Sequence, residues 1–221
     1  KTAGRSPRLA KTPASATTLR VIGGRLRGHQ FVYHGDPTTR PMKQRVREAG
    51  FNLIGPRVRG THVIDLFAGT GALAWEAISR GASSATLIER HFPTARQINQ
   101  NAAALAVADR VELVTGDTFF WAHHHLPNIA DMQRSQPWLV FCSPPYDLLV
   151  DQLEAMLELI EMVIRAAPPN SLMLVESDAR FDTDLLSDLM EWDVRRYAPA
   201  VLAVGQRHPT AQNTPPPSDN P

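Results

Sequence analysis

Between residues 62 and 177, short apolar runs alternate with longer stretches of helical character. The runs predict strands at HVIDLF, SATLIE, RVELVTG, WLVFCS and SLMLVES. The helical stretches cover about 71–80, 93–106, 118–125 and 147–166. Because the strands are apolar on both faces and alternate with helices, the pattern predicts an α/β fold with a parallel sheet covered on both sides.

The segments on either side of this region have different patterns. The run EWDVRRYAPAVLAVGQR contains two strand-like parts joined tightly at Ala198-Pro199. A tight connection requires an antiparallel pair, so we expect the last strand to run against the others. Near the other end, LRVIGG and QFVY flank GRLRGH and predict a β-hairpin. We expect Thr39 to cap, and Pro41 to begin, a helix that ends near residue 55.

Charge divides the chain unevenly. Residues 1–60 carry 13 Lys/Arg and 2 Asp/Glu, a balance of +11, whereas residues 61–221 carry 10 and 20, a balance of −10. A strongly basic segment attached to an acidic remainder of the chain indicates that residues 1–60 bind a polyanion. A basic tail that only aids solubility is the alternative.

The chain then divides into four parts. These are a disordered basic tail (1–18), a hairpin and helix that face the polyanion (19–60), the sheet domain (61–207) and a disordered tail with five prolines (208–221). We see no apolar run near the ~18 residues that span a bilayer and no secretory signal. The single cysteine, Cys142, allows no internal disulfide, so we expect a cytoplasmic protein. We expect a monomer, because no extra apolar face is obvious.

A glycine-rich turn follows the first strand of the sheet domain. It reads DLFAGTG (65–71), and the helix ALAWEAISRG comes next. At this position a parallel α/β sheet binds a nucleotide-like cofactor. Gly69 and Gly71 allow a close backbone approach, and the helix N-terminus offers free N–H groups. A plain strand-to-helix turn is the alternative, since a G-x-G pair alone is a weak signal.

Acids at three strand ends separate the cofactors that fit such a turn. Asp65 precedes the loop, Glu89 ends the second strand and Asp117 follows the third. Asp65 would repel the pyrophosphate of a dinucleotide, whereas it attracts the ammonium and sulfonium of S-adenosylmethionine (SAM). The Glu89 carboxylate can accept hydrogen bonds from the ribose hydroxyls of either cofactor, and the Asp117 carboxylate can accept one from the adenine amino group. With no basic residue in the loop, we predict SAM.

The fourth strand ends abruptly at SPPY (143–146), because two prolines cannot extend a central strand. Strands one and four should be neighbours, which places SPPY beside the methyl group of SAM. The Ser143 hydroxyl and the Pro144 carbonyl are suitable acceptors for the N–H bonds of an exocyclic amine. Tyr146 offers a face on which a base can stack. A simple β-turn is the alternative.

DLFAGTGAL and SPPY together resemble the class I SAM-dependent amino-methyltransferases that act on nucleic acids. More closely, the chain resembles the RsmD family, which methylates the N2 amine of a guanine in small-subunit (16S) ribosomal RNA. The matching stretches fall in order over residues 19–207: RVIGGRLRG, TRPMKQRVREAGFN, DLFAGTGALAWEAISRGA, ATLIER and SPPY.

This resemblance implies a Rossmann-like, seven-stranded sheet, mostly parallel with an antiparallel last strand, and a small N-terminal β-hairpin extension. It implies an rRNA substrate within a small ribosomal subunit or an assembly intermediate. The implied SAM-binding residues are Asp65, Phe67, Ala68, Gly69, Gly71, Glu89 and Asp117. For RNA we expect contacts from Arg25, Arg27, Arg40, Lys43, Arg45 and Arg47, although Arg40 and Arg45 equally suit a role in bracing the loop over the cofactor.

The chain departs from the family at Ser143, where the usual residue is Asp. SPPY also occurs in DNA cytosine-N4 methyltransferases, so a DNA amino-methyltransferase (N4-cytosine or N6-adenine) stays an alternative, although residues 19–60 are too few for a target-recognition domain. A catalytically weak RNA-binding assembly factor is a third possibility. We expect no metal, because His123, His124 and His125 are consecutive and cannot all face one ion. Cys142 is expected to pack in the core.

Overall fold

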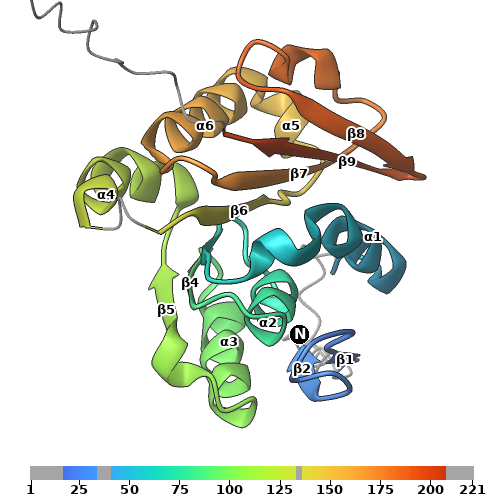
Figure 1. The fold of residues 1–221 in the computed structure, drawn as a ribbon, viewed down its shortest axis with the longest axis vertical. Helices are drawn as coiled ribbons and strands as arrows, with labels where there is room; N and C mark the ends of the chain where they lie inside the picture. The colour runs from blue at the N-terminus through green and yellow to red at the C-terminus, as the bar shows by residue number, and fades with distance from the viewer. Residues whose placement is uncertain (1–16, 34–40, 133–135, 208–221) are drawn as a thin grey trace, which may run out of the picture.

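A seven-stranded sheet forms the centre of the computed structural model, which describes residues 17–33, 41–132 and 136–207. In chain order its strands are β3 (His62–Asp65), β4 (Ser84–Glu89), β5 (Val111–Thr115), β6 (Trp138–Cys142), β7 (Leu172–Asp178), β8 (Trp192–Tyr197) and β9 (Ala200–Gln206). Across the sheet the order is β5-β4-β3-β6-β7-β9-β8. β3 to β7 are parallel, and β9 runs antiparallel to β7 and β8, which confirms the predicted class I methyltransferase sheet (Figure 1).

Helices cover both faces of this sheet. On one face lie α1 (Gln44–Ile54), α2 (Ala72–Ser79) and α3 (Phe92–Ala104), and on the other lie α4 (Thr118–Met132), α5 (Leu148–Asp151) and α6 (Leu153–Ala166) (Figure 1). Short 3-10 turns stand at Gly55–Val58, Ala108–Arg110 and Thr183–Leu186. Successive strand residues point to opposite faces, so Val63 joins one core and Ile64 the other.

Three predicted helices differ in detail. The helix expected over 118–125 is α4, which continues to Met132. α1 begins at Gln44 rather than at Pro41, because Lys43 has extended backbone angles (φ −57°, ψ 140°) that no helix can include. The expected cap, Thr39, lies outside the described residues. The helix expected over 147–166 is two helices, since Gln152 (φ −129°, ψ 43°) interrupts it between α5 and α6.

The N-terminal hairpin is present, with β1 (Thr17–Arg20) and β2 (Gln30–Tyr33) paired antiparallel. β1 begins two residues before the expected run LRVIGG, in the segment predicted to be disordered, and it ends at Arg20. It packs against α3, where the buried Asn101 side chain binds both backbone groups of Val32: its Oδ1 accepts from the N–H at 3.0 Å and its Nδ2 donates to the carbonyl at 2.8 Å. Val21, Leu26 and Phe31 join the same core as α1 and α2. The N-terminal segment is therefore packed continuously with the sheet domain.

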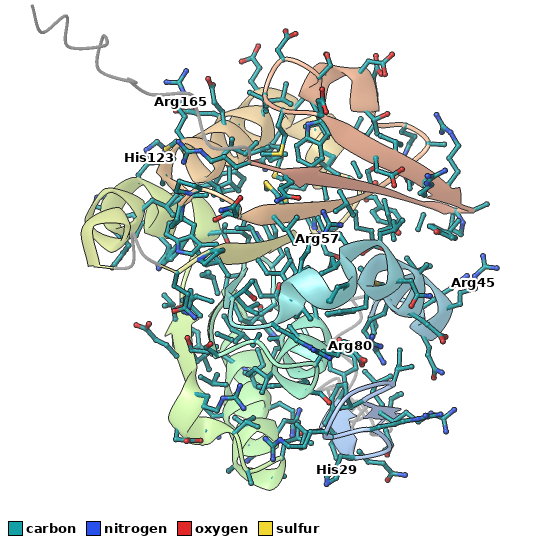
Figure 2. The ribbon with its side chains drawn as sticks, viewed as in Figure 1. His29, Arg45, Arg57, Arg80, His123 and Arg165 are labelled. Carbon is teal, nitrogen blue, oxygen red and sulfur yellow. The ribbon has the colours of Figure 1, made fainter. Side chains whose placement is uncertain are left out.

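A buried carboxylate ties the hairpin to two helices. Glu76, in α2, accepts hydrogen bonds from the backbone N–H groups of Ile22 at 2.8 Å and Gly23 at 2.7 Å. The Arg80 Nε donates to it at 2.8 Å, and the Arg47 Nε of α1 forms an ion pair with it at 3.9 Å. Figure 2 shows Arg80 between α2 and the hairpin. Because a buried charge must be paired, this network fixes the position of the hairpin.

Candidate active site

The glycine turn lies at the carboxyl end of β3, as predicted. The Ala68 N–H donates to the Ile88 carbonyl of the neighbouring β4 at 3.0 Å, and the Gly71 N–H closes the turn on the Ala68 carbonyl at 2.7 Å. Gly71 has a φ of +74°, and a Cβ there would come within 2.6 Å of the Trp75 ring. Only glycine avoids both the left-handed penalty and this clash. Gly71 therefore sets the path of the chain from the turn into α2, in a stretch where Thr70, Gly71 and Ala72 are all buried.

Asp65, the last residue of β3, is a buried carboxylate with an unsatisfied charge. It is 1% exposed, and neither of its oxygens has a hydrogen-bond partner among the described residues. Burial first, and then the nearby Glu89 carboxylate, raise its pKa from 3.8 to about 7; the adjacent Phe67 N–H lowers it without completing a hydrogen bond. Such a group is costly unless a cation pairs with it. We take this as the main indication that Asp65 belongs to a ligand site.

The two other strand-end acids bind the loops that flank this site. Glu89 accepts from the Gly69 N–H and from the His91 N–H, each at 2.8 Å, so it holds the glycine turn. Burial raises the pKa of Glu89, and these backbone donors counteract the rise. Asp117 is exposed and caps α4 by accepting from the Phe120 N–H at 3.0 Å. Both acids stand on the same edge of the sheet as Asp65.

The remaining predicted loop residues lie between these acids. Ala68 is buried, and the ring of Phe67 packs edge-on against Phe119 at the start of α4, with 6.4 Å between ring centres. The Thr118 hydroxyl donates to the Leu66 carbonyl. These contacts join the glycine turn to the loop that follows β5. The carboxyl ends of β3, β4 and β5 thus form one continuous site.

SPPY lies next to the glycine turn. β6 pairs with β3 so that Phe141 stands opposite Asp65, and the Leu66 N–H donates to the Phe141 carbonyl at 3.0 Å. Ser143 therefore leaves the sheet level with the turn, as predicted from the strand order. Pro144 is buried, and no described residue donates a hydrogen bond to its carbonyl.

A buried glutamate that the sequence analysis missed completes this edge. Glu176, on β7, is 5% exposed and accepts hydrogen bonds from two hydroxyls. Ser143 donates its Oγ–H to one carboxylate oxygen, and Tyr146 donates its hydroxyl to the other at 2.8 Å. Burial raises the pKa of Glu176, while the two hydroxyl donors lower it. The available signal was an acid at the end of the apolar run SLMLVES, which parallels the acids that end the other strands.

One residue assigned to the basic surface has another role. Arg47 is 2% exposed, forms the ion pair with Glu76 and donates to the Arg20 carbonyl at 2.7 Å. Burial lowers the pKa of Arg47, Glu76 raises it and Arg80 lowers it further. A side chain in this position cannot reach an RNA phosphate. The assignment of Arg47 to RNA binding is therefore corrected: it is part of the buried network beneath the hairpin.

The other predicted basic residues that the structure describes lie at two opposite edges of the sheet domain. Arg45 is exposed and donates to the Ala198 carbonyl at 2.5 Å, in the turn between β8 and β9 (Figure 2). Because β9 begins opposite the last residue of β7, this contact places the start of α1, with exposed Lys43, at the same edge as SPPY. Arg45 thus braces a turn of the sheet. Arg40 lies outside the described residues.

Arg25 and Arg27 stand at the opposite edge. Their loop packs on the last turn of α2, where the Ser79 carbonyl accepts from the Arg25 N–H at 2.8 Å and the Ser79 Oγ accepts from the Leu26 N–H at 2.8 Å. α2 starts at the glycine turn and ends at Ser79, about 12 Å away at 1.5 Å per residue. Both arginines are exposed, but they are separated from the site by the length of this helix.

The remaining candidate groups have local roles. His124 and His125 each bond to the carbonyl four residues earlier in α4, and their rings stack on Phe120 and Trp121. Cys142 is fully buried, and burial followed by the Asp65 charge raises its thiol pKa, which suits packing rather than nucleophilic attack. Within the described ranges, no helix is long and apolar enough to cross a bilayer.

SAM fits the residues of this edge. Its ammonium would pair with the buried Asp65 carboxylate, which has no partner among the described residues and stands beside a turn that only glycine can make. A pyrophosphate would meet this carboxylate and Glu89 at close range, with no Lys or Arg in the turn. The donor set therefore favours a cationic, phosphate-free cofactor.

Comparisons with known proteins agree with this picture. Ribosomal RNA small subunit methyltransferase D of Escherichia coli (strain K12) is 34% identical over 128 residues, 58% of this chain and 60% of that protein, so the match leaves out a substantial part of the relative. The protein of the same name from Haemophilus influenzae is 27% identical over 172 residues, 76% of this chain and 83% of the relative.

Solved structures match over a larger share of the chain. The yhhF protein of Escherichia coli has a TM-score of 0.64 and 27% identity, covering 87% of this chain and 99% of its own. An RNA methyltransferase of Salinibacter ruber, solved with S-adenosyl-L-homocysteine, has a TM-score of 0.56 over 82% of this chain and 100% of its own; at 17% identity it shows a shared fold. The model of the family described as conserved hypothetical protein 95 matches residues 19–205, so the chain belongs to that family, which confirms the RsmD-family resemblance.

Proposed function

We propose that this protein transfers the methyl group of SAM to the exocyclic N2 amine of a guanine in small-subunit rRNA. The observation that carries the proposal is the juxtaposition of the unpaired, buried Asp65 with Ser143 and Pro144 at the next strand end. The names of the E. coli and H. influenzae relatives support an rRNA substrate.

Each residue of the candidate site has its own role in the proposed methyl transfer. When bound, SAM supplies the methyl group. Asp65 holds the cofactor's ammonium, and Glu89 keeps the glycine turn in place through the Gly69 N–H. The amine of a guanine is a poor nucleophile because its lone pair is delocalised into the ring. Acceptors at Ser143 and Pro144 would orient its two N–H bonds and favour a nitrogen with an available lone pair, while the face of Tyr146 stacks on the base.

The proposed RNA surface runs from this edge, where Lys43 is exposed, to the far end of α2, where Arg25 and Arg27 are exposed. Lys43 is exposed at the start of α1, which the Arg45 contact holds near the turn between β8 and β9. Arg25 and Arg27, at the far end of α2, would contact RNA phosphates at a distance from the target base. Neutralising Lys43, Arg25 and Arg27 together should weaken RNA binding and flatten its salt dependence, because fewer counterions are released. An unchanged salt slope would contradict this surface.

The chemistry can be tested directly. The protein is incubated with methyl-labelled SAM and, separately, with small ribosomal subunits, naked 16S rRNA and DNA, and the nucleosides are analysed by mass spectrometry. We expect label in N2-methylguanosine. Label in N4-methylcytosine or N6-methyladenine of DNA would refute the rRNA assignment in favour of a DNA enzyme, and RNA binding without label would favour an assembly factor. Asp65→Asn serves as the variant that should not bind SAM.

A further inference from the structure

The edge of the sheet that holds the glycine turn and SPPY contains one buried acid, Glu176, that has no role in the proposed chemistry. Glu176 stands on β7 one position beyond Val175, which pairs with Cys142, so it lies level with Ser143 on the adjacent strand. Its two oxygens accept from two members of SPPY, the hydroxyls of Ser143 and Tyr146. At 5% exposure it has little access to water. Through these two hydrogen bonds, the buried Glu176 carboxylate can orient both the Ser143 and the Tyr146 side chains.

The hydrogen-bond directions define what Ser143 can do. A carboxylate only accepts, so Ser143 must donate its single proton to Glu176. Both lone pairs of the Ser143 Oγ are then free for the N–H of a substrate amine, since no described residue donates to this oxygen. The negative charge behind the hydroxyl makes this oxygen a stronger acceptor than an isolated serine. Tyr146 is fixed in the same way, which holds its ring in place.

We propose that Glu176 is a positioning residue of the methyl-transfer site, which orients Ser143 and Tyr146 and receives through Ser143 the proton that the target amine loses. This inference rests on the proposed function. The family resemblance implies an Asp at the position of Ser143, and its carboxylate would accept from the amine directly. Here the carboxylate comes from β7 and acts one hydrogen bond further away, so the Ser143–Glu176 pair takes the place of that Asp.

The step balances with these groups. The lone pair of the amine nitrogen forms the N–CH3 bond as the S–CH3 bond breaks, and the electron pair of that bond goes to sulfur, which becomes a neutral thioether. The nitrogen now carries a positive charge. Its proton passes to the Ser143 Oγ while the serine's own proton passes to Glu176. The products are a neutral methylated amine, an unchanged serine and a protonated Glu176, which later loses its proton to water.

Glu176→Gln tests this role, because it keeps the shape of the side chain but removes the charge and the proton acceptor. We expect kcat for labelled methyl transfer to small ribosomal subunits to fall about 100-fold. The Kd of SAM and the KM for the RNA particle should stay within about twofold, since SAM does not contact this acid in the proposed site and the Gln carbonyl can still accept from the Tyr146 hydroxyl. The matched control is Glu158→Gln, an exposed glutamate on α6, which should change none of these values.

Rescue separates a chemical role from a structural one. The double variant Ser143→Asp with Glu176→Gln restores a carboxylate beside the amine and should recover at least about tenfold of the lost kcat. A readout that needs no turnover is the carbon-13 titration of the Glu176 carboxyl. Ser143→Ala should raise its pKa further, because the Ser143 hydrogen bond opposes the effect of burial.

The outcomes are distinct. An unchanged kcat in Glu176→Gln overturns the inference, and so does a loss that Ser143→Asp does not rescue or a Glu176 titration that Ser143→Ala leaves unaltered. If Glu176→Gln does not fold, Ser143→Ala carries the test: its kcat should fall by a similar factor, and an unchanged kcat overturns the relay. A wild-type protein that methylates none of the three nucleic acids instead overturns the proposed function itself.

Discussion

Replacing Asp65 by Asn should make the cofactor-free protein more stable while it abolishes SAM binding. The reason is the burial of an unpaired charge, which raises the pKa of Asp65 from 3.8 to about 7. The Asp65 carboxyl ionises above pH 3.8 in the unfolded chain but only above about pH 7 in the folded protein. Asp65 therefore costs no stability below pH 3.8, an increasing amount between pH 3.8 and about pH 7, and a constant amount above about pH 7. At 1.36 kcal/mol for each pKa unit, the full cost is about 4 kcal/mol.

The pH dependence makes this prediction specific. We expect the stability of Asp65→Asn relative to wild type to grow by about 1.4 kcal/mol per pH unit between pH 5 and 7 and to level off above. The asparagine amide is also buried without a partner, which lowers the whole difference by about 1–3 kcal/mol but leaves its slope unaltered. Urea unfolding of both proteins at a series of pH values measures the slope, and calorimetry measures SAM binding. A difference that does not vary with pH, or unchanged SAM binding, would refute the reasoning.

Two further substitutions probe the scaffold around the site. Glu76→Gln should lower the free energy of unfolding by about 3–5 kcal/mol, because it leaves Arg47 charged and buried. The control is Glu161→Gln, which breaks an exposed ion pair with Arg165 and should lower this free energy by at most about 0.5 kcal/mol. Equal losses of stability in urea unfolding would contradict the buried network. Gly71→Ala should lower the free energy of unfolding by more than the roughly 1–2 kcal/mol that a left-handed backbone alone costs, and it should weaken SAM binding. Gly28→Ala is its control, since Gly28 also has a positive φ of 85° but no atom within 4 Å of the added Cβ, and equal losses of stability would show that the Trp75 clash is relieved without cost.

The strand and helix pattern was predictable because it depends on residues that are near in sequence. The run SATLIE became β4 with the predicted bounds, and the antiparallel pair around Ala198-Pro199 followed from the short connection alone. The helix boundaries were less accurate where no local signal marked them. Nothing in the sequence indicated that Gln152 would separate α5 from α6, because its backbone angles depend on how both helices pack.

The acids at the strand ends and the glycine turn could also be found by sequence, since a parallel sheet brings the carboxyl ends of its strands to one edge. The sequence alone therefore determined the fold class, the cofactor class and the place of SPPY. Only the tertiary structure decided which charges are buried. Arg47 and Glu76 are 29 positions apart, and Ser143 and Glu176 are 33 apart, so their pairing depends on which helices and strands become neighbours. Burial then changes the chemistry of each group, because a charge removed from water must find a partner in the protein.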